Sequence, residues 1–372
     1  MKVYRRTRRS ARPIMESLEG RQLLSGDLTA SVAGGHLVLL GDAEANEVVL
    51  TAGANAGEVV ITSGASATTI NGEDGPATLT GVTRGIVGWL RAGDDSLRIS
   101  GLTVRGNIRL DAGAGADAIT LDGDTSVAGH LRVLGGLGDD TITLDALEVA
   151  SNVALGNIAG NDTFNANQVD IGGVLQVRGG AGDDEVSLTD SEIRRTVVIH
   201  GADLSLNGCD LGGALVVVTG LLDGDVEIID STIAKPTILV TRAGADSITL
   251  AGSTFGHTFV AVTGLGADTV TIEECVFQGH FVLNTGLGDD VVNIQAEVVL
   301  EGAGTRFRRN AVIRTGAGDD ELTIGPAEQP AAAAIFDRIV HLHGGAGDDT
   351  LNHEDRGNEF TIAPVILSFE NA

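Results

Sequence analysis

Apolar and polar residues alternate in short runs that return along the chain at a nearly fixed interval. Each run follows a Gly-x-Asp phrase, as in Gly-Asp-Asp-Thr-Ile-Thr-Leu at 138–144. Most runs lie 22 or 23 residues apart, with one step of 18 and two final steps of 30 and 29. The first apolar residues, here called the repeat markers, are Leu97, Ile119, Ile142, Phe164, Val186, Leu204, Val226, Ile248, Val270, Val292, Leu322 and Leu351.

Period-two runs of β-branched residues indicate strands, and a fixed step of this length is typical of a solenoid. A second apolar run precedes each Gly-x-Asp phrase, as at 215–218, and short segments such as 230–233 allow a third strand. The chain is therefore predicted to be all-β, a single-stranded parallel β-helix of about twelve 22-residue coils, right-handed by the general crossover preference. A flattened β-roll is the alternative, whereas the frame of a leucine-rich repeat is missing.

Three regions follow from this pattern. Residues 91–372 carry the repeat and are predicted to form the solenoid. Residues 27–90 contain short β runs that do not follow the repeat, and we expect an atypical N-terminal β cap there. Residues 1–26 form a basic segment, and we expect it to be largely disordered.

The two long final steps predict insertions. About eight extra residues precede Leu322, in a coil that includes Arg306, Arg308 and Arg309, and the next coil carries Pro326 and Pro330. Both insertions are expected to be loops that leave the stack. The arginine loop is the best patch for a partner outside the repeat, although a solvated loop is the default interpretation.

The chain is strongly acidic, with a formal net charge of −27, although its first 22 residues are basic. Such a body disfavours nucleic acid and attracts divalent cations. No run of 18 apolar residues is present, so no membrane-spanning helix is expected. Cys209 and Cys275 lie three coils apart, about 14 Å in a stack, so we predict two separate buried thiols.

Aspartates recur two residues before the repeat markers in ten coils. They are Asp95, Asp117, Asp140, Asp162, Asp184, Asp246, Asp268, Asp290, Asp320 and Asp349. Ala202 and Gly224 take this position in the two middle coils. Stacked carboxylates about 4.8 Å apart repel, so the turns must splay into water, be capped by backbone N–H groups, or hold a cation such as calcium.

The phrase Gly135-Gly136-Leu137-Gly138-Asp139-Asp140-Thr141-Ile142-Thr143 resembles the nonapeptide of repeats-in-toxin, or hemolysin-type calcium-binding, proteins. Residues 179–187 and 344–352 fit as well. The resemblance implies calcium held between stacked turns by the ten aspartates. That family repeats every nine residues, whereas this chain has one copy per coil and therefore at most one metal column. Calcium along 91–190 and 244–350, or capped turns with loosely held counterions, both stay open.

Residues 18–25, Leu-Glu-Gly-Arg-Gln-Leu-Leu-Ser, resemble the LEPR-XLL segment that opens many large exported proteins of planctomycete-type bacteria. The match departs at Gly20, where the family prefers proline. The resemblance implies export or sorting, and hence an extracellular or cell-surface location. A basic tail without a role is the alternative.

Candidate chemistry outside the aspartates is sparse. His341 and His343 share a strand face, but no third ligand follows at convincing spacing. Polysaccharide-active β-helices need an acid pair or a base beside aromatics, and this chain has one Trp and one Tyr. We therefore predict a non-enzymatic surface solenoid, structural or adhesive, whose partners are divalent cations and a cell-surface polymer or protein. A metal-free rod and a polysaccharide-active enzyme are the alternatives.

Overall fold

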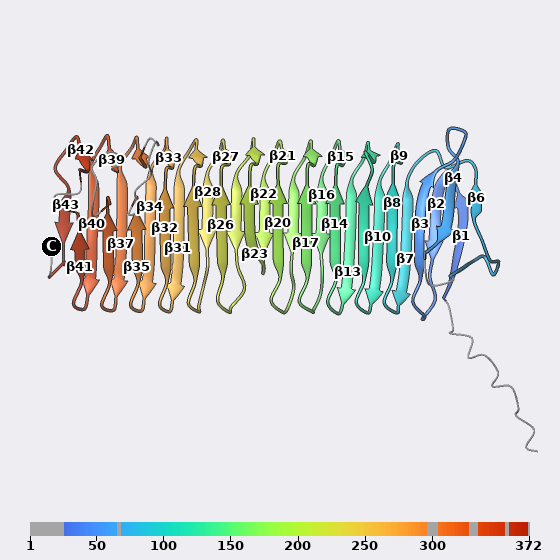
Figure 1. The fold of residues 1–372 in the computed structure, drawn as a ribbon, viewed down its shortest axis with the longest axis horizontal. Helices are drawn as coiled ribbons and strands as arrows, with labels where there is room; N and C mark the ends of the chain where they lie inside the picture. The colour runs from blue at the N-terminus through green and yellow to red at the C-terminus, as the bar shows by residue number, and fades with distance from the viewer. Residues whose placement is uncertain (1–25, 65–67, 296–303, 327–333, 354–356, 371–372) are drawn as a thin grey trace, which may run out of the picture.

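The computed structural model describes residues 26–64, 68–295, 304–326, 334–353 and 357–370, and this part is all-β, without a helix. Its strands stack into a rod with three sheets along its length (Figure 1). Sheet 1 contains β1 (Asp27–Ala33), β2 (His36–Leu40), β5 (Thr69–Ile70), β7 (Ile86–Ala92), β10 (Ile108–Ala114), β13 (Leu131–Leu137), β16 (Val153–Gly156), β19 (Leu175–Arg178), β22 (Val197–His200), β25 (Leu215–Val218), β28 (Thr237–Val240), β31 (Phe259–Leu265), β34 (Phe281–Leu287), β37 (Ala311–Ala317), β40 (Val340–Ala346) and β43 (Val365–Leu367).

Sheets 2 and 3 complete each coil. Sheet 2 contains β3 (Glu47–Ala52), β4 (Val59–Ser63), β6 (Ala77–Leu79), β8 (Ser96–Ser100), β11 (Ala118–Asp122), β14 (Thr141–Asp145), β17 (Thr163–Asn167), β20 (Glu185–Thr189), β23 (Asp203–Asn207), β26 (Asp225–Ile229), β29 (Ser247–Ala251), β32 (Thr269–Glu273), β35 (Val291–Ile294), β38 (Glu321–Ile324) and β41 (Thr350–Asn352). Sheet 3 contains the two-residue strands β9 (Thr103–Val104), β12 (Ser126–Val127), β15 (Glu148–Val149), β18 (Asp170–Ile171), β21 (Glu192–Ile193), β24 (Asp210–Leu211), β27 (Thr232–Ile233), β30 (Thr254–Phe255), β33 (Val276–Phe277), β36 (Arg306–Phe307), β39 (Ile335–Phe336) and β42 (Glu359–Phe360).

The repeat markers stack in sheet 2, which confirms the predicted parallel solenoid of about twelve coils. Ile119 pairs with Leu97 on one side and with Ile142 on the other, and the same register continues to Leu351. Every repeat marker is buried. Within each strand, the residues that alternate with the buried positions point outward. The period of two therefore separates a core face from a solvent face. The predicted right-handed winding stays a prediction.

Antiparallel strands cover the N-terminal end of the stack. β2 and β3 already stack in parallel on β7 and β8, with Val48 beside Leu97. β1 then pairs antiparallel with β2, and β4 pairs antiparallel with β3 and β6. The predicted cap region therefore contributes the first coil as well as its cover, which shields the open strand edges.

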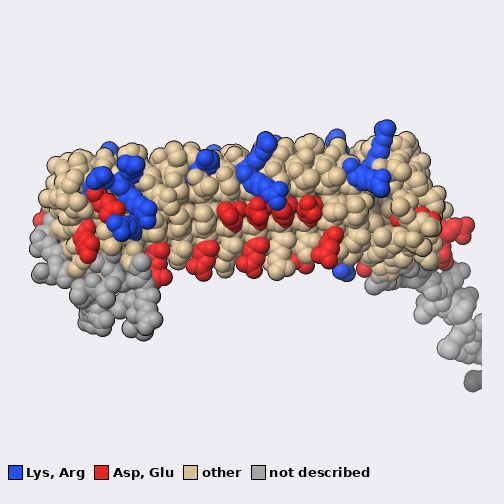
Figure 2. Space-filling view, turned by 90° about the horizontal axis from the view of Figure 1, so that it is seen from above, with Lys and Arg blue, Asp and Glu red and all other residues tan. Residues whose placement is uncertain are grey.

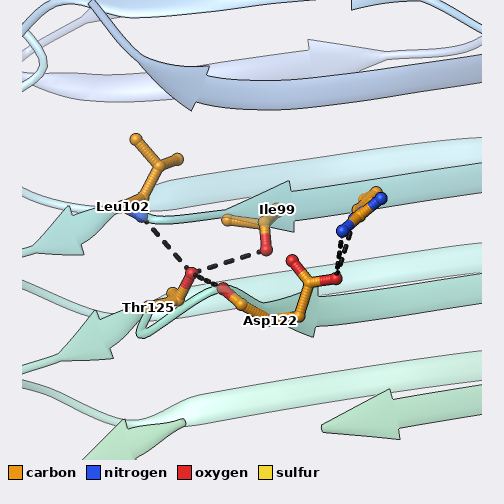
Figure 3. Close-up of polar contacts among 5 residues, drawn as sticks. Ile99, Leu102, Asp122 and Thr125 are labelled. Carbon is orange, nitrogen blue, oxygen red and sulfur yellow. Dashed lines mark hydrogen bonds and ion pairs between the residues drawn. The ribbon is translucent and has the colours of Figure 1, made fainter. Parts of the chain in front are cut away.

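Hydroxyl groups hold the corner between sheets 2 and 3 (Figure 3). The Thr125 hydroxyl donates to the carbonyl of Asp122 and accepts the N–H of Leu102 from the preceding coil. Ser231 accepts the N–H of Cys209 in the same way. Cys209 and Cys275 sit at this corner as free, buried thiols, as predicted, and burial raises their pKa values to about 11 and about 12.

The short step in the repeat has a direct structural explanation. The 18-residue step arises because β22 joins β23 through Gly201 and Ala202 alone, which removes the Gly-x-Asp turn.

The expectation that Arg306 and Arg308 lie in a departing loop is wrong, because Arg306 belongs to β36 and the Arg308 N–H donates to the Phe277 carbonyl. The buried Phe307 between them anchors this segment in the core. Residues 296–303 and 327–333 of the two insertions lie outside the described residues.

Phenylalanines fill the core of the C-terminal half. Phe255, Phe277, Phe307, Phe336 and Phe360 stack from coil to coil in sheet 3, with ring centroids 4.6–5.1 Å apart and nearly parallel planes. Phe259 and Phe281 of sheet 1 contact this column edge to face. The two geometries are those that aromatic quadrupoles favour, so each ring adds to the burial of its neighbours.

Acidic side chains follow the rod in rows, and Lys and Arg gather towards one side of the view onto sheet 3 (Figure 2). A few ion pairs join neighbouring coils, such as Arg194 with Asp170 at 2.7 Å. The arginines of these pairs are exposed, so solvent screening keeps their contribution to stability small.

Candidate functional site

The ten aspartates predicted as metal ligands lie in the turns that join sheet 1 to sheet 2. A representative turn connects β13 to β14 through residues 138–140. Gly138 has a φ of +113°, and a Cβ added there would lie 2.1 Å from the carbonyl oxygen of Gly115 in the preceding coil. Only glycine allows the turns to stack this closely, which brings the aspartates into one column.

All ten aspartates are buried, with at most 4% of their surface exposed. The Oδ1 atom of each accepts a hydrogen bond from the backbone N–H at the same position in the preceding coil. We call this column the aspartate ladder. Its bonds run from Asn46 to Asp95, Asp95 to Asp117, Asp117 to Asp140, Asp140 to Asp162, Asp162 to Asp184, Gly224 to Asp246, Asp246 to Asp268, Asp268 to Asp290, Asp290 to Asp320 and Asp320 to Asp349, at 2.7–3.1 Å.

The second carboxylate oxygen of each ladder aspartate is left without a partner. All ten Oδ2 atoms are buried and accept no hydrogen bond from the described residues. Burial and the neighbouring carboxylates raise the pKa values of Asp95 and Asp140 to about 7 and those of Asp184 and Asp290 to about 6, against the opposing effect of the N–H bonds. Burial also raises the pKa values of Asp117, Asp268 and Asp320. The ladder therefore favours a proton or a cation on its inner side near neutral pH.

Threonines form a second ladder beside the aspartates in the C-terminal half. Five residues before the aspartate, the hydroxyl of Thr263 donates to the carbonyl of Thr285, and Thr285 repeats this contact with Thr315. These hydroxyls lie beside the carboxyl groups of Asp268, Asp290 and Asp320, whose pKa values are raised chiefly by burial. Since each hydroxyl hydrogen is used in a carbonyl bond, the hydroxyl oxygen stays available to accept a hydrogen bond from the O–H of a protonated carboxyl group.

An outer row of acids lies one residue before the ladder and is exposed. Asp94 accepts the N–H of Ala116, Asp139 accepts that of Asn161, and Asp289 accepts that of Asp319. The outer acids are thus also capped by backbone, but by the N–H of the following coil, and water can solvate their second oxygen. The two rows therefore differ in their need for a neutralising partner.

The ladder is interrupted where the sequence breaks its pattern. Ala202 is buried in the shortened turn. Gly224 donates its N–H to Asp246, but it has no carboxylate that could accept an N–H from the preceding coil. Asp203 lies beside this break, and burial and neighbouring acids raise its pKa to about 6. The structure thus brings the predicted aspartates together in two separate columns of five.

The ends of the ladder and its threonine neighbours were not identified from the sequence. Asn46 supplies the first N–H, and the Glu370 carboxylate accepts the N–H of Asp349 at 2.9 Å. The threonine signal was available, because Thr stands five residues before Asp in four successive C-terminal coils. Asn46 and Glu370 gave no such signal, since both lie off the repeat.

A metal site among the described residues would have to use the ladder carboxylates and the carbonyl oxygens of their turns. Among the described residues, no group of three or more His, Cys, Asp and Glu side chains is arranged to hold a metal ion. His341 and His343 lie on β40, on its outer side. The ten orphaned Oδ2 atoms fit the oxygen preference of calcium, although each turn offers only one of them and the remaining ligands would be carbonyl oxygens.

Comparisons with known proteins identify no relative: no family model, no curated protein and no solved structure matches this chain. No described helix is long and apolar enough to cross a membrane. The LEPR-XLL-like residues 18–25 lie outside the described residues. Both sequence resemblances stay predictions.

Asp140→Ala and Asp140→Asn should separate the two roles of a ladder carboxylate. The alanine variant leaves the buried N–H of Asp117 without an acceptor, which should cost about 1–3 kcal/mol of unfolding free energy. The asparagine variant keeps that acceptor and removes the charge, so at pH 8 with chelator it should match or exceed the wild type. Chemical denaturation measures both, with Asp139→Ala in the exposed row as the control. Equal losses for alanine and asparagine would contradict this assignment.

Proposed function

We propose that this chain is a structural or adhesive rod displayed at the cell surface or outside the cell. The observation that carries the proposal is the unbroken parallel register of sheet 1 from β2 to β43. Fourteen stacked strands at about 4.8 Å make a stiff body roughly 60 Å long. Each coil packs mainly on its neighbours, so length can be built without a central functional pocket.

The acidic surface and the N-terminal resemblance support the location. A net charge of −27 keeps a rod soluble and separate from other acidic polymers unless cations bridge them. The LEPR-XLL-like segment supports export, although its role rests on sequence alone. The partner that best suits an acidic rod is a cell-envelope polymer or protein joined to it through divalent cations.

Protease treatment of intact cells tests the location, with an epitope tag placed at the C-terminus. Surface display predicts that the tagged chain is cleaved while a cytoplasmic marker in the same cells is spared. Protection of the tag until the cells are lysed would contradict the proposal. Depolymerisation of an acidic polysaccharide, abolished by one change outside the repeat, would instead support the enzymatic alternative.

Calcium in the ladder is a second part of the proposal, supported by the ten orphaned Oδ2 atoms. Two columns of carboxylate and carbonyl oxygens would be available. The first comes from the five turns from Asp95 to Asp184, and the second from the five turns from Asp246 to Asp349. A bound dication would neutralise adjacent carboxylates and so remove the repulsion between coils. Outside these columns the outer acids would hold only loosely bound counterions.

Calcium should therefore raise the melting temperature at pH 8, where the ladder is ionised. Binding to the folded state alone adds RT ln(1 + [L]/Kd) of stability, which is about 2.7 kcal/mol at a hundredfold excess over Kd. Differential scanning calorimetry with calcium, with magnesium and with chelator makes the measurement. An identical melting temperature in all three would leave the metal-free rod as the surviving interpretation.

A further inference from the structure

The outer face of sheet 1 is unusually apolar for a solvent-facing sheet surface. It consists of two columns of outward residues, one on each side of the buried middle position of the strands. The first column contains Val38, Val87, Arg109, Arg132, Ala154, Gln176, Val198, Val216, Ile238, Val260, Val282, Val312, His341 and Val365. The second contains Leu40, Trp89, Asp111, Leu134, Gly156, Arg178, His200, Val218, Val240, Val262, Asn284, Arg314, His343 and Leu367.

The outer face of sheet 2 provides an internal comparison. It has the same pleat and the same alternation of burial, but its outward columns are polar. The column that runs between the buried pairs there is Arg98, Thr120, Thr143, Asn165, Ser187, Ser205, Glu227, Thr249, Thr271, Asn293, Thr323 and Asn352. The coil architecture therefore does not require apolar residues outside, and sheet 1 carries them for another reason.

Sheet 1 strands in the C-terminal half have the sequence character of strands that are covered on both faces. Segments such as Leu215–Val218 and Phe259–Val262 are continuous apolar runs, which parallel strands show when both of their faces are buried. Ile238 is 39% exposed in the isolated chain, and Val365 and Leu367 are 39% and 50% exposed. A contiguous apolar surface of this extent marks an interaction site.

Charge distinguishes this face from the rest of the molecule. The protein has a net charge of −27, yet Asp111 is the only acidic residue in the two columns. Arg109 and Arg132 lie beside each other on β10 and β13. Asp111 lies two residues from Arg109 on the same strand and the same side, so the face carries both halves of a complementary pair.

We propose that the outer face of sheet 1 is the interface of a homodimer in which two rods lie side by side and parallel. Two flat sheets pack with their strands nearly aligned and about 10 Å apart, so a two-fold axis runs either along the rod or along the strands. An axis along the rod places the first column of one copy against the second column of the other. Arg109 then faces the Asp111 carboxylate of the second copy twice, and Ile238 faces Val240.

The other two-fold arrangement is electrostatically worse. An axis along the strands sets the rods antiparallel, and centring the apolar stretch from β22 to β37 brings His200 opposite Arg314 of the second copy. Arg109 would then have no acid opposite it. Arg109 faces an acid only in the parallel pair, so charge complementarity selects that arrangement.

The extent of the face suits a stable dimer. The two columns lie about 7 Å apart, and with their side chains they form a strip about 14 Å wide and roughly 60 Å long. This strip covers roughly 800 Å² on each rod, the typical size of a specific protein interface. The single Trp of the chain, Trp89, lies within this area and is 39% exposed. Tryptophan is frequent among residues that dominate binding energy.

Sedimentation velocity of the full chain over a concentration series tests the dimer. We expect a dimer at tens of micromolar, and Ile238→Lys should raise the dissociation constant by about 100-fold, because two ammonium groups enter the centre of the interface. Thr249→Lys, on the outer face of sheet 2 in the same coil, is the matched control and should leave the dimer intact. Circular dichroism confirms that both variants fold. A wild-type monomer at these concentrations, or equal effects of the two lysines, would overturn the proposal.

A charge exchange tests the parallel arrangement. Arg109→Asp and Asp111→Arg should each raise the dissociation constant at low salt by about tenfold, and the double exchange should restore it. Maleimide dyes on a cysteine introduced at Thr120 should give efficient transfer between two copies, since Cys209 and Cys275 are buried and react slowly. Additive losses in the double exchange, or absence of transfer in a proven dimer, would overturn the parallel arrangement.

Discussion

Lowering the pH from about 8 to about 5, with chelator present, should raise the melting temperature by roughly 5–10 °C. The folded pKa values of Asp95 and Asp140 are about 7, and those of Asp184 and Asp290 about 6, against 3.8 for an unperturbed aspartate. Between these values the folded state binds more protons than the unfolded chain, so stability falls as pH rises. After allowance for residual solvation, each of these four carboxyl groups contributes on the order of 1–2 kcal/mol. Together they account for the expected rise in melting temperature.

The sign of this pH dependence distinguishes the protein from one stabilised by ionised carboxylates, whose stability would fall as the pH is lowered. The ladder's contribution is fully present below pH 4 and is lost as pH rises through 6 to 7. Combining Asp→Asn at Asp95, Asp140, Asp184 and Asp290 should flatten the dependence, because asparagine keeps the Oδ1 acceptor without a titrating charge. Calcium should flatten it as well by stabilising the ionised ladder. A quadruple variant that keeps the full pH dependence would place the responsible groups elsewhere.

Phe277→Ala should lower the free energy of unfolding by about 3–5 kcal/mol. Its ring is fully buried and lies 4.9 Å from Phe255 and 5.0 Å from Phe307 in stacked geometry. It also makes edge contacts with Phe259 and Phe281. Removing it opens a cavity at the point where five rings meet, so the loss exceeds that of a core residue in the N-terminal half, where no such ring cluster is present among the described residues.

Hydrogen exchange locates this effect along the rod. Because coils interact mainly with their neighbours, protection should fall first in the coils around residues 250–340 and persist around residues 97–190. Phe277→Leu is the control and should cost much less, because it keeps most of the volume. A uniform loss of protection along the chain would show that the rod unfolds as one unit and would contradict the local account.

The coil was predictable because solenoid geometry turns sequence period into spatial register. Ile119 and Ile142 pair because equal spacing stacks equal positions, and the same argument placed Asp117 and Asp140 in one column. Their burial was not predictable in the same way. A Gly-x-Asp turn can point its carboxylate outward or inward, and the inward choice depends on the N–H of the preceding coil, which is a contact between residues 22 or 23 positions apart.

Long-range packing also explains what the sequence pattern left open. Eight of the nine phenylalanines lie between residues 255 and 369, and only the stacking of coils of unequal length brings Phe277, Phe307 and Phe336 into one column. The number of extra residues predicts a loop around Arg306, whereas the buried Phe307 beside it anchors this segment in β36. The apolar runs of sheet 1 gave strands correctly, but which of their residues face outward depends on the register with both neighbours.

Melting curves at pH 5 and pH 8, each with calcium and with chelator, test most directly whether the buried ladder must be neutralised. We expect a low melting temperature only at pH 8 with chelator, and recovery on adding either protons or calcium. Equal melting temperatures at the two pH values in chelator would show that the inner carboxylates carry their charge without cost, and would contradict the assignment of the aspartate ladder.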